Sequence, residues 1–502
     1  MAKPNILFIM ADQLAAQFLP FYGHPLVKTP NLSRLAAEGV VFENCYSNSP
    51  LCAPARATVM NGLLPSRTGV YDNAAEFPSA VPTWAHYLRL AGYKTCLSGK
   101  MHFVGPDQLH GLEERLTTDI YPADFGWTPD WRLKQERIDW WYHNMTSVLQ
   151  PGVAEITNQL EFDDEVAFLA VRKIYDYARF ENETPFCLMA SFTHPHDPYA
   201  ARAKFWDLYD DADIDLPRVG CVALDPHSQR LWDVSAMDDY DVTEADIRAA
   251  RHGYFANISY IDDLVGQLIA SLEATGKLED TIIVFTSDHG DFLGERGLWY
   301  KMSFLEPSAH VPLLVWSPKF AARRVKEPVS LADLAPTLAD IAGVKLAREV
   351  DGRSLLPLLK GAAENGDATA WGEYLAEGAV APMYMLRRGP WKFIHTPSDP
   401  DQLFNLADDP DELHNLAHPI AAQFRHEVEA KFDIPRINTE VLQSQQSRHM
   451  MFEALKHGQR FPWDFQPLRD ASEQYTRNHM SVTERDLKSR FPQAPDIAGK
   501  RR

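Results

Sequence analysis

The sequence has no long hydrophobic run, few cysteines and no excess of basic residues. No apolar stretch approaches the ~20 residues of a membrane-spanning helix, so no such helix is expected. The 5 cysteines are an odd number, and three lie within or beside apolar strand-like runs, which argues against a disulfide framework. The net charge of −20 argues against a nucleic-acid partner, because phosphates need a basic face.

The first four residues, MAKP, lead directly into a strand-like run and lack the cleavage region of a signal peptide. Together with the cysteine usage, this predicts a cytoplasmic location. With 502 residues, 45% of them hydrophobic and 24% charged, the composition is that of a large globular protein. Because the net charge is negative, a local cluster of cations would have to bind any anionic substrate.

Four short apolar runs are each followed by polar residues that can do chemistry. Continuous apolar runs predict strands buried on both faces of a parallel sheet, and the helical patterns between them predict a doubly wound α/β fold. The runs are residues 5–10, 94–98, 186–192 and 281–287, and the helical patterns include residues 32–38, 83–91 and 254–273. Ligands bind beyond the carboxyl ends of parallel strands, so we expect one edge to gather Asp12, Lys100, His196 and Asp288. Taken singly, each of these residues could instead serve a cap or a turn.

Residues 50–62 predict a loop that enters a helix, with Cys52 at or just before the helix N-terminus. Pro54 suits a first helical turn, because its missing N–H would be unpaired there anyway. Free backbone N–H groups and the helix dipole favour an anion at Cys52, and Arg56 adds a cation one turn later. A lone cysteine is more often a small buried hydrophobe, so this interpretation depends on the whole Cys-x-Pro-x-Arg spacing.

That spacing resembles the signature of the type I sulfatases, members of the alkaline phosphatase superfamily. Residues 92–102 (GYKTCLSGKMH) resemble the second sulfatase signature, and residues 287–290 (SDHG) resemble the metal-binding turn of the family. Asn61 stands where the family more often has Thr, Ala or Arg. The resemblance implies an alkaline-phosphatase-like α/β fold, a mostly parallel sheet sandwiched by helices. It also implies that a formylglycine-generating enzyme oxidises Cys52 to formylglycine, an aldehyde.

The same resemblance implies a catalytic domain at 1–365, a small C-terminal α+β subdomain at 366–435 and a tail at 436–502. Residues 387–394 and 403–406 resemble the start of that subdomain. Shortly afterwards, Asp409 to Glu412 have the pattern of a helix start. In the tail, residues 439–457 predict a polar helix with an apolar stripe, and an aromatic arm follows. So short a segment cannot bury these side chains alone, so we expect the tail to assemble a homodimer or homotetramer.

The family's functional residues can be carried over to this sequence. The implied metal ligands are Asp12, Gln13, Cys52, Asp288 and His289. Oxygen-rich ligation favours Ca²⁺, but Gln13 and His289 stand where many sulfatases have Asp and Asn, which leaves room for Mn²⁺. The cations expected around the sulfuryl oxygens are Arg56, Lys100, His196 and Lys301. One hydroxyl of the hydrated aldehyde would attack sulfur, and deprotonation of the other, assisted by His102, would expel sulfate. His196 or Lys301 would protonate the leaving oxygen.

Residues 119–144 are rich in aromatic side chains, which predicts either a packing cluster or a cage for a quaternary ammonium group. The region includes Tyr121, Phe125, Trp127, Trp131, Trp140, Trp141, Tyr142 and His143. Its sequence, with residues 99–111, 372–378 and 475–480, closely resembles the choline-sulfatases. This implies hydrolysis of choline O-sulfate to choline and inorganic sulfate, with Trp127, His143 and Glu377 around the trimethylammonium group. Two alternatives stay open: a phosphonate monoester or phosphodiester hydrolase, and a non-catalytic protein that binds quaternary ammonium solutes.

Overall fold

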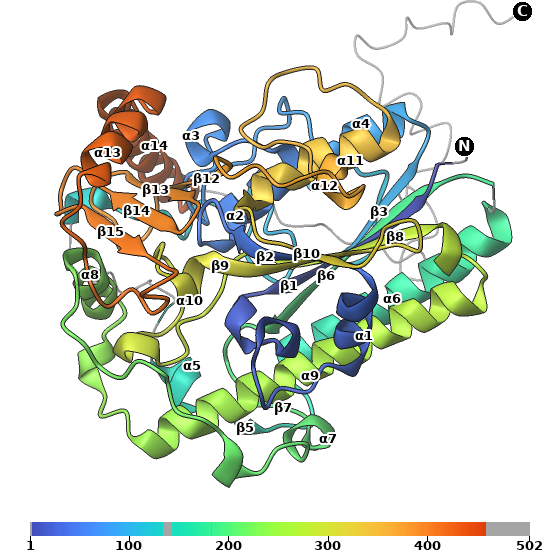
Figure 1. The fold of residues 1–502 in the computed structure, drawn as a ribbon, viewed down its shortest axis with the longest axis horizontal. Coiled ribbons are helices and arrows are strands. Elements are labelled where there is room, and N and C mark those ends of the chain that lie inside the picture. The colour runs from blue at the N-terminus through green and yellow to red at the C-terminus, as the bar shows by residue number, and fades with distance from the viewer. Residues whose placement is uncertain (1–2, 134–142, 144, 182, 458–502) are drawn as a thin grey trace, which may run out of the picture. The chain divides into compact units, whose positions relative to one another are not determined.

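A mixed β-sheet forms the centre of the fold in the computed structural model, which describes residues 3–133, 143, 145–181 and 183–457. Within these residues the sheet has nine strands in the order β10-β2-β9-β8-β1-β6-β3-β4, with β11 paired to β2 (Figure 1). Their bounds are β1 Asn5–Asp12, β2 Val40–Tyr46, β3 Lys94–Gly99, β4 Glu114–Arg115, β6 Phe186–Pro195, β8 Thr281–Ser287, β9 His310–Trp316, β10 Arg323–Val325 and β11 Val329–Ser330. All described residues belong to the unit that residues 1–464 form.

The four strands predicted from the sequence lie side by side in the sheet. β8, β1, β6 and β3 are consecutive neighbours and run parallel. Three of them, β1, β6 and β8, are buried along their whole length, which explains their continuous apolar runs. β9 runs antiparallel to both β8 and β2, so the sheet is mostly parallel rather than wholly so. The carboxyl ends of the four parallel strands share one edge of the sheet.

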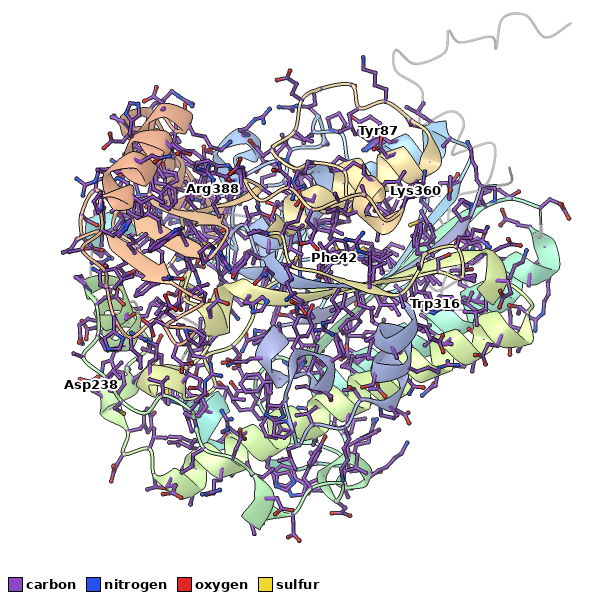
Figure 2. All side chains as sticks on the ribbon, viewed as in Figure 1. Phe42, Tyr87, Asp238, Trp316, Lys360 and Arg388 are labelled. Atoms are coloured by element: carbon purple, nitrogen blue, oxygen red, sulfur yellow. The ribbon has the colours of Figure 1, made fainter. Side chains whose placement is uncertain are left out.

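Helices cover both faces of this sheet (Figure 1). One face carries α1 Pro30–Glu38, α6 Asn158–Phe180 and α9 Glu244–Ala274, and the other carries α2 Cys52–Asn61, α4 Trp84–Leu90, α11 Leu334–Ala342 and α12 Leu356–Leu359. Alternate side chains of β1 enter separate hydrophobic clusters, Ile9 on the first face and Phe8 on the second. Figure 2 shows side chains filling both layers, with Trp316 in the first cluster and Phe42 in the second. The predicted sheet sandwiched by helices is confirmed.

Shorter elements connect these layers. They are α3 Pro65–Thr68, α5 Thr146–Leu149, α7 Ala203–Trp206, α8 Pro226–Val234, α10 Glu306–Ala309 and the strand pair β5 Gly152–Val153 and β7 Ala200–Ala201. Among the helices in the described part of the chain, none combines the length and the apolar composition that crossing a membrane requires.

A second, antiparallel sheet follows later in the chain, in the order β12-β13-β14-β15. Its strands are β12 Thr369–Tyr374, β13 Met383–Arg388, β14 Trp391–His395 and β15 Gln402–Asn405, and the helices α13 Ile420–Lys431 and α14 Ile434–Leu455 come next. Lys392 on β14 ties this sheet to α10, with its Nζ 2.9 Å from Oε1 of Glu306. The expected smaller C-terminal α+β part is confirmed, whereas its boundaries at 365/366 and 435/436 stay predictions.

One local prediction in this part is wrong. Residues 409–412 form a turn, and the next helix, α13, begins only at Ile420. The Glu412 side chain turns inward to the buried Lys392, with Oε1 2.8 Å from Nζ, and its backbone takes φ 56°. This tertiary ion pair overrides the local capping pattern. The helix predicted at residues 439–457 is confirmed as part of α14.

Candidate active site

Cys52 is the first residue of α2, as the sequence predicts. Leu51 before it is extended, and Pro54 lies within the first helical turn. Asn73 holds this helix start, because its Oδ1 accepts a hydrogen bond of 2.9 Å from the backbone N–H of Ala53. The Cys52 side chain is buried and points toward the edge where β1 and β8 end.

Two carboxylates and an imidazole surround Cys52. Candidate ligand atoms of Asp12, Cys52, Asp288 and His289 all lie within 4.8 Å of one another, and all four residues are buried. His289 Nε2 lies 3.3 Å from the Cys52 Sγ and 3.8 Å from Asp12 Oδ1. The other ring nitrogen, Nδ1, lies 3.0 Å from the Gly290 carbonyl oxygen, which fixes the tautomer that turns Nε2 toward the carboxylates.

This donor set fits a divalent metal ion. Buried carboxylates are costly unless a cation pairs with them, and hard cations prefer carboxylate oxygens. A neutral imidazole is also accepted by Mn²⁺ and its neighbours in the first transition row. Gln13, the fifth expected ligand, directs its Oε1 to the Lys301 ammonium at 2.6 Å.

Arg56 and Lys100 bring two buried positive charges to the same place. Arg56 Nε donates to Asp288 Oδ2 at 2.8 Å, and one of its terminal nitrogens lies 3.3 Å from Asp12 Oδ2. The Lys100 ammonium bonds to Asp12 and lies 3.5 Å from the Cys52 Sγ. Burial opposes ionisation of the Cys52 thiol, but Lys100, Lys301 and His289 outweigh it and hold its pKa well below the usual range.

Gly99 is required where β3 turns into Lys100. Its φ of 116° favours glycine, and a Cβ there would lie 1.9 Å from the Ser191 carbonyl oxygen. Ser191 on β6 is in turn a hydrogen-bond partner of Arg56, whose terminal N–H donates to its Oγ at 2.8 Å. Sequence reasoning assigned no role to Ser191 or to Asn73, since Asn73 stands in no signature and Ser191 lies inside an apolar run.

Lys301 and His196 complete the opposite side of the site. Lys301 Nζ lies 2.9 Å from His196 Nε2, and His196 Nδ1 lies 2.8 Å from the Asp197 carbonyl oxygen. The Gln13 amide N–H₂ donates to Asp291 at 2.7 Å and to Asp197 at 3.2 Å, which fixes its carbonyl oxygen toward Lys301. The structure therefore brings together all the predicted charged residues at the strand ends.

His102 lies at the aromatic side of the site. Asp119 fixes its backbone, because Oδ2 accepts from the N–H groups of both Met101 and His102 at 2.9 Å. Burial alone would raise the pKa of Asp119, but Arg115, His102 and the two backbone N–H groups together lower it. The His102 ring lies 5.4 Å from the Tyr121 ring and 5.8 Å from the Trp127 ring. Sequence reasoning gave Asp119 no role, since a lone aspartate in a loop carries no pattern.

The three residues predicted around the trimethylammonium group lie near the Cys52 site, because Cys52 acts electrostatically on Glu377 and on His143, and the Trp127 ring lies beside the His102 ring. Glu377 is buried, and among the described residues neither of its carboxylate oxygens has a hydrogen-bond partner. Burial, Asp72 and Cys52 raise the pKa of Glu377 well above its usual range. The His143 ring lies 4.5 Å from the Tyr300 ring, and burial next to Lys301 keeps the pKa of His143 low. Trp140, Trp141 and Tyr142 lie outside the described residues.

Comparison with known proteins identifies this arrangement. The sulfatase family model matches residues 4–344, which contain Cys52 and every predicted charged site residue except Glu377. The chain belongs to the sulfatase family. The model for the C-terminal part of choline sulfatase enzymes matches residues 439–491, and that for the C-terminal part of N-sulphoglucosamine sulphohydrolase matches residues 294–434.

Individual sulfatases and related hydrolases are similar over most of the chain. A choline-sulfatase of Rhizobium meliloti is 53% identical over 98% of this chain and 99% of its own. Arylsulfatase K of Danio rerio is 32% identical over 81% of this chain and 78% of its own. The solved phosphonate monoester hydrolase of Agrobacterium radiobacter has a TM-score of 0.67 and 26% identity, over 89% of this chain and 96% of that chain.

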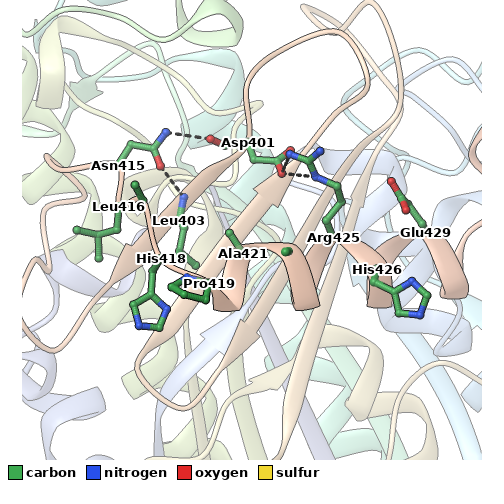
Figure 3. A pocket seen from close by; sticks show the side chains of 12 residues that line it. Asp401, Leu403, Asn415, Leu416, His418, Pro419, Ala421, Arg425, His426 and Glu429 are labelled. Atoms are coloured by element: carbon green, nitrogen blue, oxygen red, sulfur yellow. Dashed lines mark hydrogen bonds and ion pairs between the residues drawn. The ribbon is translucent and has the colours of Figure 1, made fainter.

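A separate hollow of about 720 Å³ lies on the smaller C-terminal part of this sulfatase, and it includes none of the predicted site residues. Figure 3 shows Asp401, Asn415 and Arg425 at its rim, joined by hydrogen bonds and ion pairs. Because these polar groups already pair with one another, the hollow is a poor candidate for binding a charged ligand.

Proposed function

We propose that this sulfatase hydrolyses choline O-sulfate to choline and inorganic sulfate. The observation that carries the proposal is the buried carboxylate of Glu377 near Cys52, which has no hydrogen-bond partner among the described residues. A buried carboxylate without a counter-charge is costly, and a substrate cation would provide that charge. Identity of 53% to a choline-sulfatase over almost the whole chain supports the same substrate.

In this proposal a formylglycine-generating enzyme would convert Cys52 to formylglycine, and this modified residue would supply the nucleophile. Asp12, Cys52, Asp288 and His289 would hold the divalent metal, with Gln13 as the fifth ligand that the family resemblance implies. We favour Ca²⁺ over Mn²⁺. When bound, such an ion lowers the pKa of an oxygen nucleophile and neutralises charge on the sulfate.

The cations of the chain have separate tasks in this proposal. Arg56 and Lys100 are held rigidly by buried hydrogen bonds, so they are preorganised for charge that develops on the sulfuryl oxygens. Lys301 and His196 share a hydrogen bond and would deliver a proton to the ester oxygen. His102, fixed by Asp119, would take the proton whose removal releases sulfate.

Trp127, His143 and Glu377 would bind the trimethylammonium end of the substrate. An aromatic face and a carboxylate attract a quaternary ammonium group together, and neither needs a donor hydrogen from it. We further propose a cytoplasmic location, because all five cysteines are unpaired and four of them are buried.

A second candidate is hydrolysis of phosphonate monoesters or phosphodiesters. His289 in the metal-binding turn and the 26% identity to a phosphonate monoester hydrolase favour it. Comparing kcat/KM for choline O-sulfate, 4-nitrophenyl sulfate and phenyl phenylphosphonate in the purified enzyme decides between the two.

The test of the cation site uses the Trp127→Ala and Glu377→Gln variants. A cation–π contact is worth ~0.5–2 kcal/mol, so choline O-sulfate should lose several-fold or more in kcat/KM. 4-Nitrophenyl sulfate, which has no cationic group, should lose little. Glu453→Gln, on the exposed side of α14, is the matched control. Equal losses on both substrates would mean that Trp127 and Glu377 only maintain the fold.

A further inference from the structure

We propose that Arg448 on α14 is a positioning residue that sets the preference for a cationic substrate. The inference rests on the proposed function, because it concerns the residues that would bind the trimethylammonium group. Arg448 is 4% exposed and forms a two-pronged ion pair with Asp72, at 2.6 Å and 2.7 Å. One of its terminal nitrogens also donates to the Thr128 Oγ1 at 3.1 Å.

Two adjacent turns of α14 contact both segments that carry the cation-binding residues. Thr128, a hydrogen-bond partner of Arg448, directly follows Trp127 in the chain. Gln445, one turn earlier, accepts a hydrogen bond of 3.0 Å from the Trp131 backbone N–H. The Trp131 indole N–H in turn donates to the Ala376 carbonyl oxygen at 2.9 Å, directly before Glu377.

Arg448 also decides how many negative charges the substrate cation meets. Asp72 lies close enough to Glu377 to disfavour its ionisation, so two carboxylates share this buried region. The guanidinium of Arg448 pairs with both oxygens of Asp72, which leaves one carboxylate, that of Glu377, for a single positive charge. Without Arg448, Asp72 would be a second buried charge without a counter-ion, and the two carboxylates would repel each other.

Different parts of the sequence would bind the metal and sulfate and set the preference for a cationic substrate. The predicted ligands of the metal and sulfate lie within residues 4–344, the match of the general sulfatase family model. Arg448 and Gln445 lie within residues 439–491, the match of the choline-sulfatase C-terminal model. In this inference α14 contributes to substrate choice by positioning the residues that would bind the cation.

The experiment compares the full-length Arg448→Met and Arg448→Lys variants with Arg436→Met, a control on the exposed part of the same helix. We expect Arg448→Met to lower kcat/KM for choline O-sulfate about tenfold or more, mainly through KM, because it breaks a buried ion pair. 4-Nitrophenyl sulfate should change by about twofold or less, since the catalytic residues keep their own hydrogen bonds. Arg448→Lys keeps the positive charge but cannot pair with both oxygens of Asp72 as the guanidinium does. Its kcat/KM for choline O-sulfate should therefore lie between those of Arg448→Met and the unmodified chain.

The double variant Asp72→Asn/Arg448→Met separates positioning from general stability. Because it removes the unpaired charge as well, it should recover part of the choline preference that Arg448→Met loses. Equal losses on the two substrates, or no recovery in the double variant, would overturn the inference.

The inference can still be tested if Arg448→Met fails to fold. If Arg448→Met does not fold, Arg448→Lys and Gln445→Leu carry the test, and an unchanged substrate ratio in both overturns the inference. If the unmodified chain itself shows no preference for choline O-sulfate over 4-nitrophenyl sulfate, the proposed function fails. That result is visible before any variant is compared.

Discussion

The Lys301 ammonium lies 2.9 Å from Nε2 of His196 in the buried site. An ammonium group only donates, so His196 accepts at Nε2 and carries its own proton on Nδ1, which faces the Asp197 carbonyl oxygen at 2.8 Å. The pair therefore holds a transferable proton at Lys301, and the 2.6 Å bond to Gln13 Oε1 orients it. This geometry suits a proton donor to a poor leaving group.

Loss of this donor should depend on the leaving group. Choline leaves as an alkoxide of high pKa, whereas 4-nitrophenolate needs little help. We expect Lys301→Met and His196→Ala to lower kcat on choline O-sulfate by ~10²–10⁴-fold and to lower it much less on 4-nitrophenyl sulfate. Lys319→Met, at an exposed lysine, is the control. If both substrates lose the same factor, Lys301 and His196 bind sulfate but do not protonate the ester oxygen.

Cys52 should be found as an aldehyde in active enzyme. We expect peptide mass spectrometry to detect formylglycine at this position in chain produced with a formylglycine-generating enzyme, and a thiol in inactive chain produced without it. Cys52→Ala should abolish turnover, whereas Cys221→Ser, at the exposed cysteine, should leave it unchanged. Substantial turnover by Cys52→Ala would exclude the proposed nucleophile.

Removal of divalent metal should abolish activity while the chain stays folded. Arg56 and Lys100 partly compensate the carboxylates of the site, so the fold does not depend on the ion alone. We expect elemental analysis to find about one divalent ion per chain, and Asp288→Asn to lose it, while Asp213→Asn on the surface retains it. Adding back Ca²⁺ or Mn²⁺ to the chelated enzyme identifies the ion. Full activity of metal-free protein would contradict the expected metal site.

The strand ends were predictable because their signal is local. Continuous apolar runs identify buried parallel strands, and parallel strands align their carboxyl ends, so the sequence alone places Asp12, Lys100, His196 and Asp288 together. The pairing of Asp72 with Arg448 could not be predicted in this way. The two residues lie 376 positions apart, and a buried ion pair leaves no periodic pattern in either segment. At residues 409–412 the local pattern was misleading. It predicted a helix start, but the ion pair of Glu412 with Lys392 holds these residues in a turn.

Glu373 should make the folded state less stable as the pH rises. It is buried on β12, one oxygen accepts from the Ser66 backbone N–H at 2.7 Å, and burial raises its pKa from 4.5 to about 7. The folded state thus retains a proton that the unfolded state releases. The stabilisation that proton binding to Glu373 gives the folded state is fully present below the pKa of Glu373 in the unfolded chain. It is lost as the pH rises through about 7, the pKa of Glu373 in the folded chain.

Glu373→Gln should remove this dependence. At pH 8 the variant should gain up to ~3 kcal/mol in the free energy of unfolding over the unmodified chain, and at low pH the two should converge. Melting temperatures measured between about pH 5 and 8.5 check this, with Glu453→Gln on the surface as the control. Parallel pH profiles of the two proteins would show that Glu373 is ionised in both states.

The tail should hold the sulfatase in a homodimer or homotetramer, as the apolar stripe of residues 439–457 predicts. Met450 is 63% exposed on α14, Met451 37% and Leu455 38%, whereas Gln445 and Arg448 on the same helix are buried against their own chain. A truncation should therefore end after His457 rather than near Pro435, so that it removes the arm and keeps the contacts of α14. We expect light scattering to find an oligomer for the full chain and a smaller species for the truncated one, because an exposed apolar surface favours association.

Met450→Ser/Met451→Ser should weaken the oligomer, whereas Phe168→Ser, at a side chain 65% exposed on α6, should not. A full-length monomer at micromolar concentration would show that the tail contacts only its own subunit.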